Sequence, residues 1–220
     1  MKPRITSRPE AGLNLFEVGV VVAILAILAA VFLSNFSLTA DNHRVPLINC
    51  VNNLKQVGLA YRIWEGDNGD RYPMGVSVTN GGSMEMVATG NVVQTFLVMS
   101  NVLATPKILW CPADSAGLCA SAFEGLANSN ISYFINADVT NDATPQAILS
   151  GDGNFELGGK PVSPGLLPLG TNDPVDWTAG RHIRKCCLLI GDGSVQSVTA
   201  LGLHGFFVEA GMATNRLAIP

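Results

Sequence analysis

The sequence predicts an α+β fold in which a long N-terminal helix packs its second half against a small antiparallel sheet with large loops. Residues 18–33 form an unbroken apolar run, and residues 47–64 repeat apolar side chains at helical spacing. Near the C-terminus two short apolar segments flank an Asp192-Gly193 pair. This pair is a strong hairpin signal, because such a turn requires positive φ.

The composition fits one loop-rich domain. The chain has 220 residues, of which 48% are hydrophobic and 14% are charged, with 23 Gly and 12 Pro. Its formal net charge is −4, which argues against nucleic acid as a partner because phosphate binding requires a basic face.

The N-terminus allows three interpretations, of which the first two leave one residue unexplained. A secretory signal peptide could be cut after Ala40, although Leu38 and Thr39 fit such a site poorly. A plain membrane anchor would use residues 13–33, about 31 Å of helix, with the preceding basic residues keeping the N-terminus in the cytoplasm. Neither accounts for Glu17, since a carboxylate inside an apolar stretch costs about a few kcal/mol and usually has a partner.

The third interpretation assigns Glu17 a role. Gly12, followed by an apolar residue and by Glu five places after the glycine, resembles the type IV prepilin signal. In that family a prepilin peptidase cuts after the glycine and methylates the new amine, so the resemblance implies cleavage between Gly12 and Leu13 and N-methylation of Leu13. Glu17 would then neutralise this amine in its own helix or in a neighbouring subunit during assembly. Leu13 and Asn14 depart from the family's Phe and Thr, and no basic residue directly precedes Gly12.

The helix is expected to continue beyond the apolar run. Pro46 marks a bend or a restart, because proline removes a backbone donor and clashes with the preceding turn. The apolar face after it comprises Leu47, Cys50, Val51, Leu54, Val57, Gly58, Tyr61 and Trp64. Turn residues at 66–70 end the helix. The periodicity is compatible with one helix of about fifty residues or with two separate helices.

Several further segments resemble a group of bacterial pilin-like proteins related to type II secretion. They are residues 50–60, Tyr72-Pro73-Met74, Cys111-Pro112-Ala113-Asp114 and residues 129–134. The most specific element is His182, followed after nine residues by Asp192-Gly193, a spacing found near the C-terminus of these proteins. The resemblance covers nearly the whole chain and implies a pilin-like fold.

The C-terminal half provides the sheet predictions. Residues 186–190 are expected to form a strand, residues 191–194 a turn and residues 195–198 the returning strand. Residues 131–135 are another strand candidate, and the apolar residues within 216–220 could dock on the head. His182 precedes the hairpin, where we expect a hydrogen bond that secures the strand entrance.

The sequence shows no catalytic set, and we expect neither enzymatic activity nor a cofactor. His43, His182 and His204 have no metal-ligand spacing with one another, so no metal site is predicted. Asp67 and Asp70 are weak calcium candidates, although a solvated turn at the helix end is the favoured interpretation.

The five cysteines include no CxxC pair, which gives no support to zinc-ribbon or thioredoxin-type sites. If the head is exported, disulfides can form, and one between Cys50 and Cys111 would tie the helix to the head. Cys186 and Cys187 are adjacent, so in a strand they should point to opposite faces.

Together these observations divide the chain into three parts. Residues 1–12 are the leader, and residues 13–40 are the transmembrane and filament-core half of the N-terminal helix. Residues 41–220 are the head, which includes the second half of the helix at about 46–66. The expected location is the bacterial inner membrane, with a single pass and the head in the periplasm or outside the cell.

The expected function is that of a structural subunit of a type II secretion-like pseudopilus, stored in the membrane and assembled into a filament after cleavage. Its expected partners are prepilin peptidase, other pilin-like subunits, the inner-membrane platform of a secretion system and the lipid bilayer. Two alternatives are a type IV pilus subunit for adhesion or uptake, and a membrane-anchored periplasmic binding protein.

Overall fold

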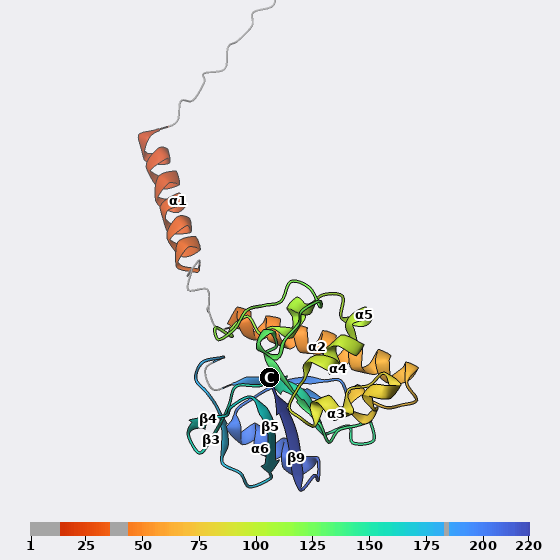
Figure 1. Cartoon of the computed structure of the whole chain (residues 1–220). Helices are drawn as coiled ribbons and strands as arrows, with labels where there is room; N and C mark the ends of the chain where they lie inside the picture. The colour runs from red at the N-terminus through yellow and green to blue at the C-terminus, as the bar shows by residue number, and fades with distance from the viewer. Residues whose placement is uncertain (1–13, 36–43, 183–184) are drawn as a thin grey trace, which may run out of the picture. The chain divides into compact units, whose positions relative to one another are not determined.

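The computed structural model describes residues 14–35, 44–182 and 185–220 (Figure 1). The chain divides into two compact units, Met1–Asp41 and Asn42–Pro220. The predicted leader, with Gly12 and Leu13, lies outside the described residues, and so does His43. The α+β prediction is confirmed, because the second unit combines helices with antiparallel sheets.

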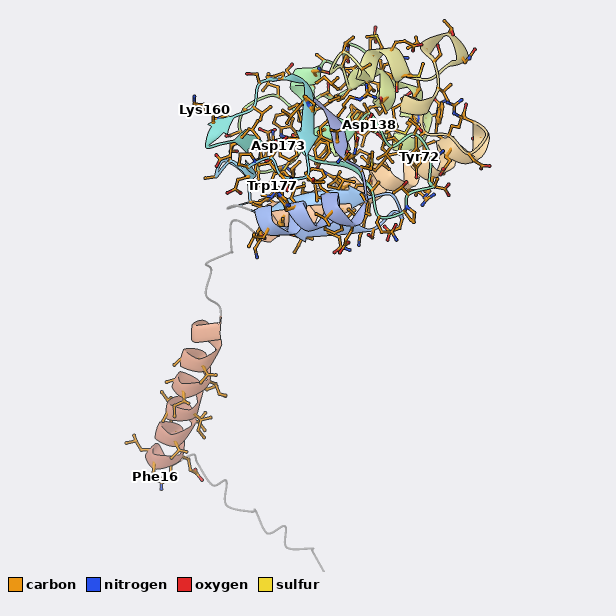
Figure 2. All side chains as sticks on the ribbon, turned by 90° about the horizontal axis from the view of Figure 1, so that it is seen from below. Phe16, Tyr72, Asp138, Lys160, Asp173 and Trp177 are labelled. Atoms are coloured by element: carbon orange, nitrogen blue, oxygen red, sulfur yellow. The ribbon has the colours of Figure 1, made fainter. Side chains whose placement is uncertain are left out.

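Helix α1, Leu15–Asn35, contains a single charged residue, Glu17, near its start. The apolar side chains described on this helix, within residues 15–31, project outward from it (Figure 2). The exposed fraction is 91% for Leu15 and 77% for Phe16. Asn14 Oδ1 accepts a hydrogen bond from the Phe16 N–H at 3.4 Å, and the Glu17 carboxylate accepts one from the Asn14 N–H at 3.0 Å. This reciprocal arrangement is a capping box, which satisfies two free backbone donors at the helix start.

Among the helices of the described residues, none combines the length and apolar character required to span a membrane. The assignment of residues 13–40 to a transmembrane segment stays a prediction.

Helix α2, Arg44–Asp67, forms the predicted second helix and ends within the predicted turn residues 66–70. Pro46 lies in its first turn, where a missing N–H leaves no intrahelical bond unmade. The predicted apolar face is confirmed, since its fully buried side chains include Cys50, Leu54, Val57 and Tyr61. Residues 36–43, between α1 and α2, lie outside the described residues, so the alternatives of one long helix or two separate helices stay predictions.

A six-stranded antiparallel sheet forms the centre of the head, with strand order β5-β9-β1-β2-β7-β8. Its strands are β1 Tyr133–Asn136, β2 Ile148–Asp152, β5 Gly165–Gly170, β7 Cys186–Ile190, β8 Val195–Val198 and β9 Thr214–Ile219. A second sheet of three short strands has the order β4-β3-β6, with β3 Phe155–Leu157, β4 Lys160–Pro161 and β6 Val175–Trp177.

Both faces of the large sheet are covered (Figure 1). One core joins α2 to the sheet and to the short helices α3 Met84–Val87, α4 Val93–Val98, α5 Ser100–Leu103 and η3 Pro106–Leu109. The remaining 3-10 turns are η1 Pro73–Gly75, η2 Val78–Asn80 and η4 Asn128–Asn130. The other core contains α6, Ala200–Glu209, and the three-stranded sheet, and Figure 2 shows Trp177 of β6 next to α6.

The hairpin prediction is confirmed in detail. β7 and β8 pair antiparallel over the predicted residues, and Gly193 in the turn has φ of +87°. Cys186 and Cys187 belong to opposite cores, as strand alternation predicts. The C-terminal segment does more than dock: as β9 it pairs with β5 on one side and β1 on the other, so it is an inner strand of the sheet.

Candidate functional site

Four side chains with metal-ligating atoms meet in the interior of the head. They are Cys50, Cys111, Asp152 and His182, and one ligand atom from each lies within 4.8 Å of all the others. All four residues are buried. Among the described residues this is the one group of its kind, and it contains neither Asp67 nor Asp70.

Each member of this Cys–Cys–His–Asp cluster comes from a different element. Cys50 lies on the buried face of α2, and Cys111 follows the 3-10 turn η3. Asp152 is the last residue of β2, opposite Tyr133 of β1. His182 lies in the segment between β6 and β7. The cluster therefore stands where α2, two loops and the sheet meet.

Short contacts link the four groups. The Cys111 Sγ is 3.0 Å from His182 Nε2, and the Cys50 Sγ donates to Asp152 Oδ1 at 3.3 Å. His182 Nε2 is 3.9 Å from Asp152 Oδ2. Cys50 Sγ also lies 3.3 Å from the Tyr133 hydroxyl. The polar atoms of all four ligands therefore face a common centre.

The electrostatic environment keeps both sulfurs protonated in the absence of a cation. The hydrogen bond with Cys50, together with burial, raises the pKa of the Cys111 thiol. The same bond lowers the pKa of Cys50, but contact with Cys187, burial and the charge of Asp152 outweigh it, so that pKa is also raised. A buried, neutral thiol is a poor nucleophile, and it must lose its proton before it can bind a metal ion.

His182 has an uncommon backbone conformation, and its imidazole is buried. Its backbone φ is +43°, a conformation that costs a residue other than glycine about 1 kcal/mol or more. Its Nδ1 is buried and has no hydrogen-bond partner within the part of the chain that the structure describes. Burial lowers the pKa of His182, but the bond with Cys111 and the charge of Asp152 outweigh burial and raise it.

A network of buried polar groups fixes the two loops that carry Cys111 and His182. Arg181 forms an ion pair with Asp114, and its Nη1 donates to the Ser132 carbonyl at 2.9 Å. The Ser132 hydroxyl donates to the Asp114 carboxylate at 2.8 Å and accepts from the Cys111 N–H at 3.0 Å. The two loops are thus joined through one serine and one ion pair.

The segments singled out in the sequence converge on this region. Cys50, Cys111 and His182 enter the cluster itself, while Asp114, Ser132 and Tyr133 surround it. The expected hydrogen bond of His182 is present, and its partner is a cysteine.

The Asp192-Gly193 turn lies elsewhere and contacts α2. Arg62 donates to the Gly191 carbonyl next to the turn at 2.6 Å, and a Cβ on Gly58 would lie 3.8 Å from the Gly193 carbonyl oxygen. His182 and the Asp192-Gly193 turn, the two parts of the His-nine-residues-Asp-Gly element, therefore contact different residues: His182 contacts Cys111, and the turn region contacts α2.

Sequence reasoning missed two things here. Asp152 was not predicted, because a fully buried carboxylate is rare and the strand residues Ile148–Asp152 give no signal for one. The sequence also did not predict that Cys50, Cys111 and His182 lie together, because no two of them are close in sequence.

The other predicted residues lie apart from the cluster. Cys50 and Cys111 are free thiols in this structure, and their disulfide stays a prediction. Asp67 ends α2, and the Asp70 N–H donates to the Glu65 carbonyl at 3.1 Å in the following turn. Glu17 belongs to the α1 unit.

Comparison with known proteins found no matching family model, curated protein or solved structure.

Proposed function

We propose that this protein is a pilin-like structural subunit, stored in the bacterial inner membrane and assembled into a type II secretion-like pseudopilus. The observation that carries the proposal is α1. It is a helix of 21 residues that is apolar on every side and holds one carboxylate in its first turn. A helix that is hydrophobic all round is one that is buried on all sides, by lipid or by other helices.

The position of the Glu17 carboxylate supports an assembly role. The carboxylate reaches back to the Asn14 N–H, so it already lies at the start of the helix. Cleavage after Gly12 would place a free amine on Leu13, directly before Asn14. A charged amine in an apolar environment requires a partner, and Glu17 is the acidic side chain at that end of the helix.

The head supports the same function. Helix α2 lies close against β7, because a Cβ on Gly58 would stand only 2.7 Å from a side-chain carbon of Leu189. A helix packed along an antiparallel sheet is the arrangement that the resemblance to pilin-like proteins implies. In this proposal α1 provides the membrane and filament contacts, prepilin peptidase processes the chain, and the head is structural rather than enzymatic.

The mature N-terminus tests the proposal. Mass spectrometry of the protein extracted from membranes should find a chain that begins at N-methylated Leu13. A mature chain that begins at Asp41 would show a secretory signal peptide, and an intact Met1 would show a plain anchor. Either result would overturn the proposed function.

A further inference from the structure

We propose that the head binds one Zn²⁺ ion in a closed structural site formed by Cys50, Cys111, His182 and Asp152. The site is independent of the filament function, since it concerns the head alone. It would join α2, the loop after η3, β2 and the segment before β7 through a single ion.

The ligand types suit zinc. Two thiolates, an imidazole nitrogen and a carboxylate oxygen are all common zinc ligands, and four protein ligands make a closed structural site. Calcium would require six to eight oxygen ligands, which this cluster does not contain. Soft sulfur ligands likewise disfavour magnesium and manganese.

The distances between ligand atoms are close to those that tetrahedral coordination requires. Zinc bonds of about 2.0–2.3 Å at tetrahedral angles place ligand atoms about 3.3–3.8 Å apart. Cys111 Sγ lies 3.0 Å from His182 Nε2, Cys50 Sγ lies 3.3 Å from Asp152 Oδ1, and His182 Nε2 lies 3.9 Å from Asp152 Oδ2. These values lie on both sides of the tetrahedral range, so small side-chain shifts would complete the site.

The surroundings hold the ligands in place, as metal sites require. The Cys187 N–H donates to Asp152 Oδ2 at 2.8 Å, which orients the carboxylate. The Tyr133 hydroxyl lies 3.3 Å from the Cys50 sulfur. The ion pair between Asp114 and Arg181 fixes the two loops that bear the other ligands.

Binding requires no oxidant or reductant. Zn²⁺ enters, both thiols lose a proton to solvent, and two Zn–S bonds form together with bonds to the neutral imidazole and the carboxylate. The bound centre then carries a net charge of −1, the same as the empty centre with two thiols, a neutral imidazole and a carboxylate. The ion thus introduces no additional buried charge.

The rival state is the Cys50–Cys111 disulfide, and the other two side chains argue against it. A disulfide requires only the two sulfurs, whereas here Asp152 and His182 also point at them. Oxidation would remove the Cys50 donor from the fully buried Asp152 carboxylate, which would keep the Cys187 N–H as a hydrogen-bond donor. Loss of a hydrogen-bond donor to a buried charge is costly.

Metal analysis of the full-length chain tests the proposal. The protein would be extracted in detergent without a histidine tag, and its metal content measured by mass spectrometry of the elements. We expect about one zinc per chain. After removal of the metal with a chelator, Co²⁺ should bind with thiolate-to-cobalt charge-transfer absorption and the visible bands of tetrahedral cobalt.

Substitutions of single cysteines test which side chains bind the ion. Cys50→Ser and Cys111→Ser should each weaken the charge-transfer absorption and reduce bound zinc at least tenfold. Cys186→Ser is the matched control, because Cys186 is equally buried but its sulfur contacts Asn154 on the other face of the sheet. It should keep full zinc and cobalt binding.

Three results would overturn the proposal, and the first two need only the unmodified chain. One is a Cys50–Cys111 disulfide found by non-reducing peptide mapping of the freshly isolated protein. Another is a reduced chain that takes up neither Zn²⁺ nor Co²⁺, or that binds Co²⁺ without thiolate absorption. The third is full zinc binding by a folded Cys111→Ser variant.

Discussion

Replacing Glu17 by Gln separates the capping contact that the structure shows for this carboxylate from its proposed role as a charge partner. Gln keeps an oxygen acceptor at the same reach, so it can still accept the Asn14 N–H and preserve the capping box, whereas it removes the charge. Ala removes both. If Glu17 only caps the helix, Gln should behave like the parent chain, and Ala should lose about 1 kcal/mol of helix stability.

The charge role predicts a different pattern. Removing one partner of a buried pair leaves the other charge uncompensated, which costs about 3–5 kcal/mol. That exceeds the capping contribution several-fold, and a filament repeats the contact in every subunit. Gln and Ala should therefore both abolish filament formation or secretion, and Asp, whose shorter side chain reaches less far, should be intermediate.

The assay compares assembly with membrane storage. Membrane fractionation should show normal levels of mature Glu17→Gln and Glu17→Ala protein, since both substitutions make the segment more apolar. A filament-shearing or secretion assay on the same cells reports assembly. Parent-like assembly by Glu17→Gln would refute the charge-pair mechanism and leave capping as the role of Glu17.

Two further predictions concern the head, and urea or thermal unfolding of the full chain measures both. Gly58→Val should lower stability by about 1–3 kcal/mol, because a Cβ there would stand 2.7 Å from a leucine side-chain carbon of β7. Gly66→Val, in open space on the same helix, should change stability by less than about 0.5 kcal/mol, and equal effects at the two sites would contradict the close packing. Asp114→Ala should lower the free energy of unfolding by about 3–5 kcal/mol, because it leaves the mostly buried Arg181 without its ion-pair partner. Asp142→Ala, at an exposed ion pair, should cost less than about 1 kcal/mol, and a similarly small loss for Asp114→Ala would show that the loop network is unimportant.

Local pattern was sufficient for the elements whose geometry is local. The buried face of α2 follows from apolar residues at spacings of three and four, and the β7–β8 hairpin follows from Asp192-Gly193 between two apolar runs. The capping box at the start of α1 follows from Asn14 and Glu17, three residues apart, although Glu17 was interpreted only as a charge partner. In each case the residues that determine the structure are neighbours along the chain.

Tertiary structure alone decided the rest. The chain end became an inner strand because β5 and β1, which precede it by tens of residues, offer it two free edges. Cys50, Cys111, Asp152 and His182 carry no recognisable ligand spacing, because each lies on a different element and only the packing of α2 against the sheet brings them together. A zinc motif can be found in sequence when one short loop supplies several ligands. Here four distant segments supply one each, so the site exists only once the chain has folded.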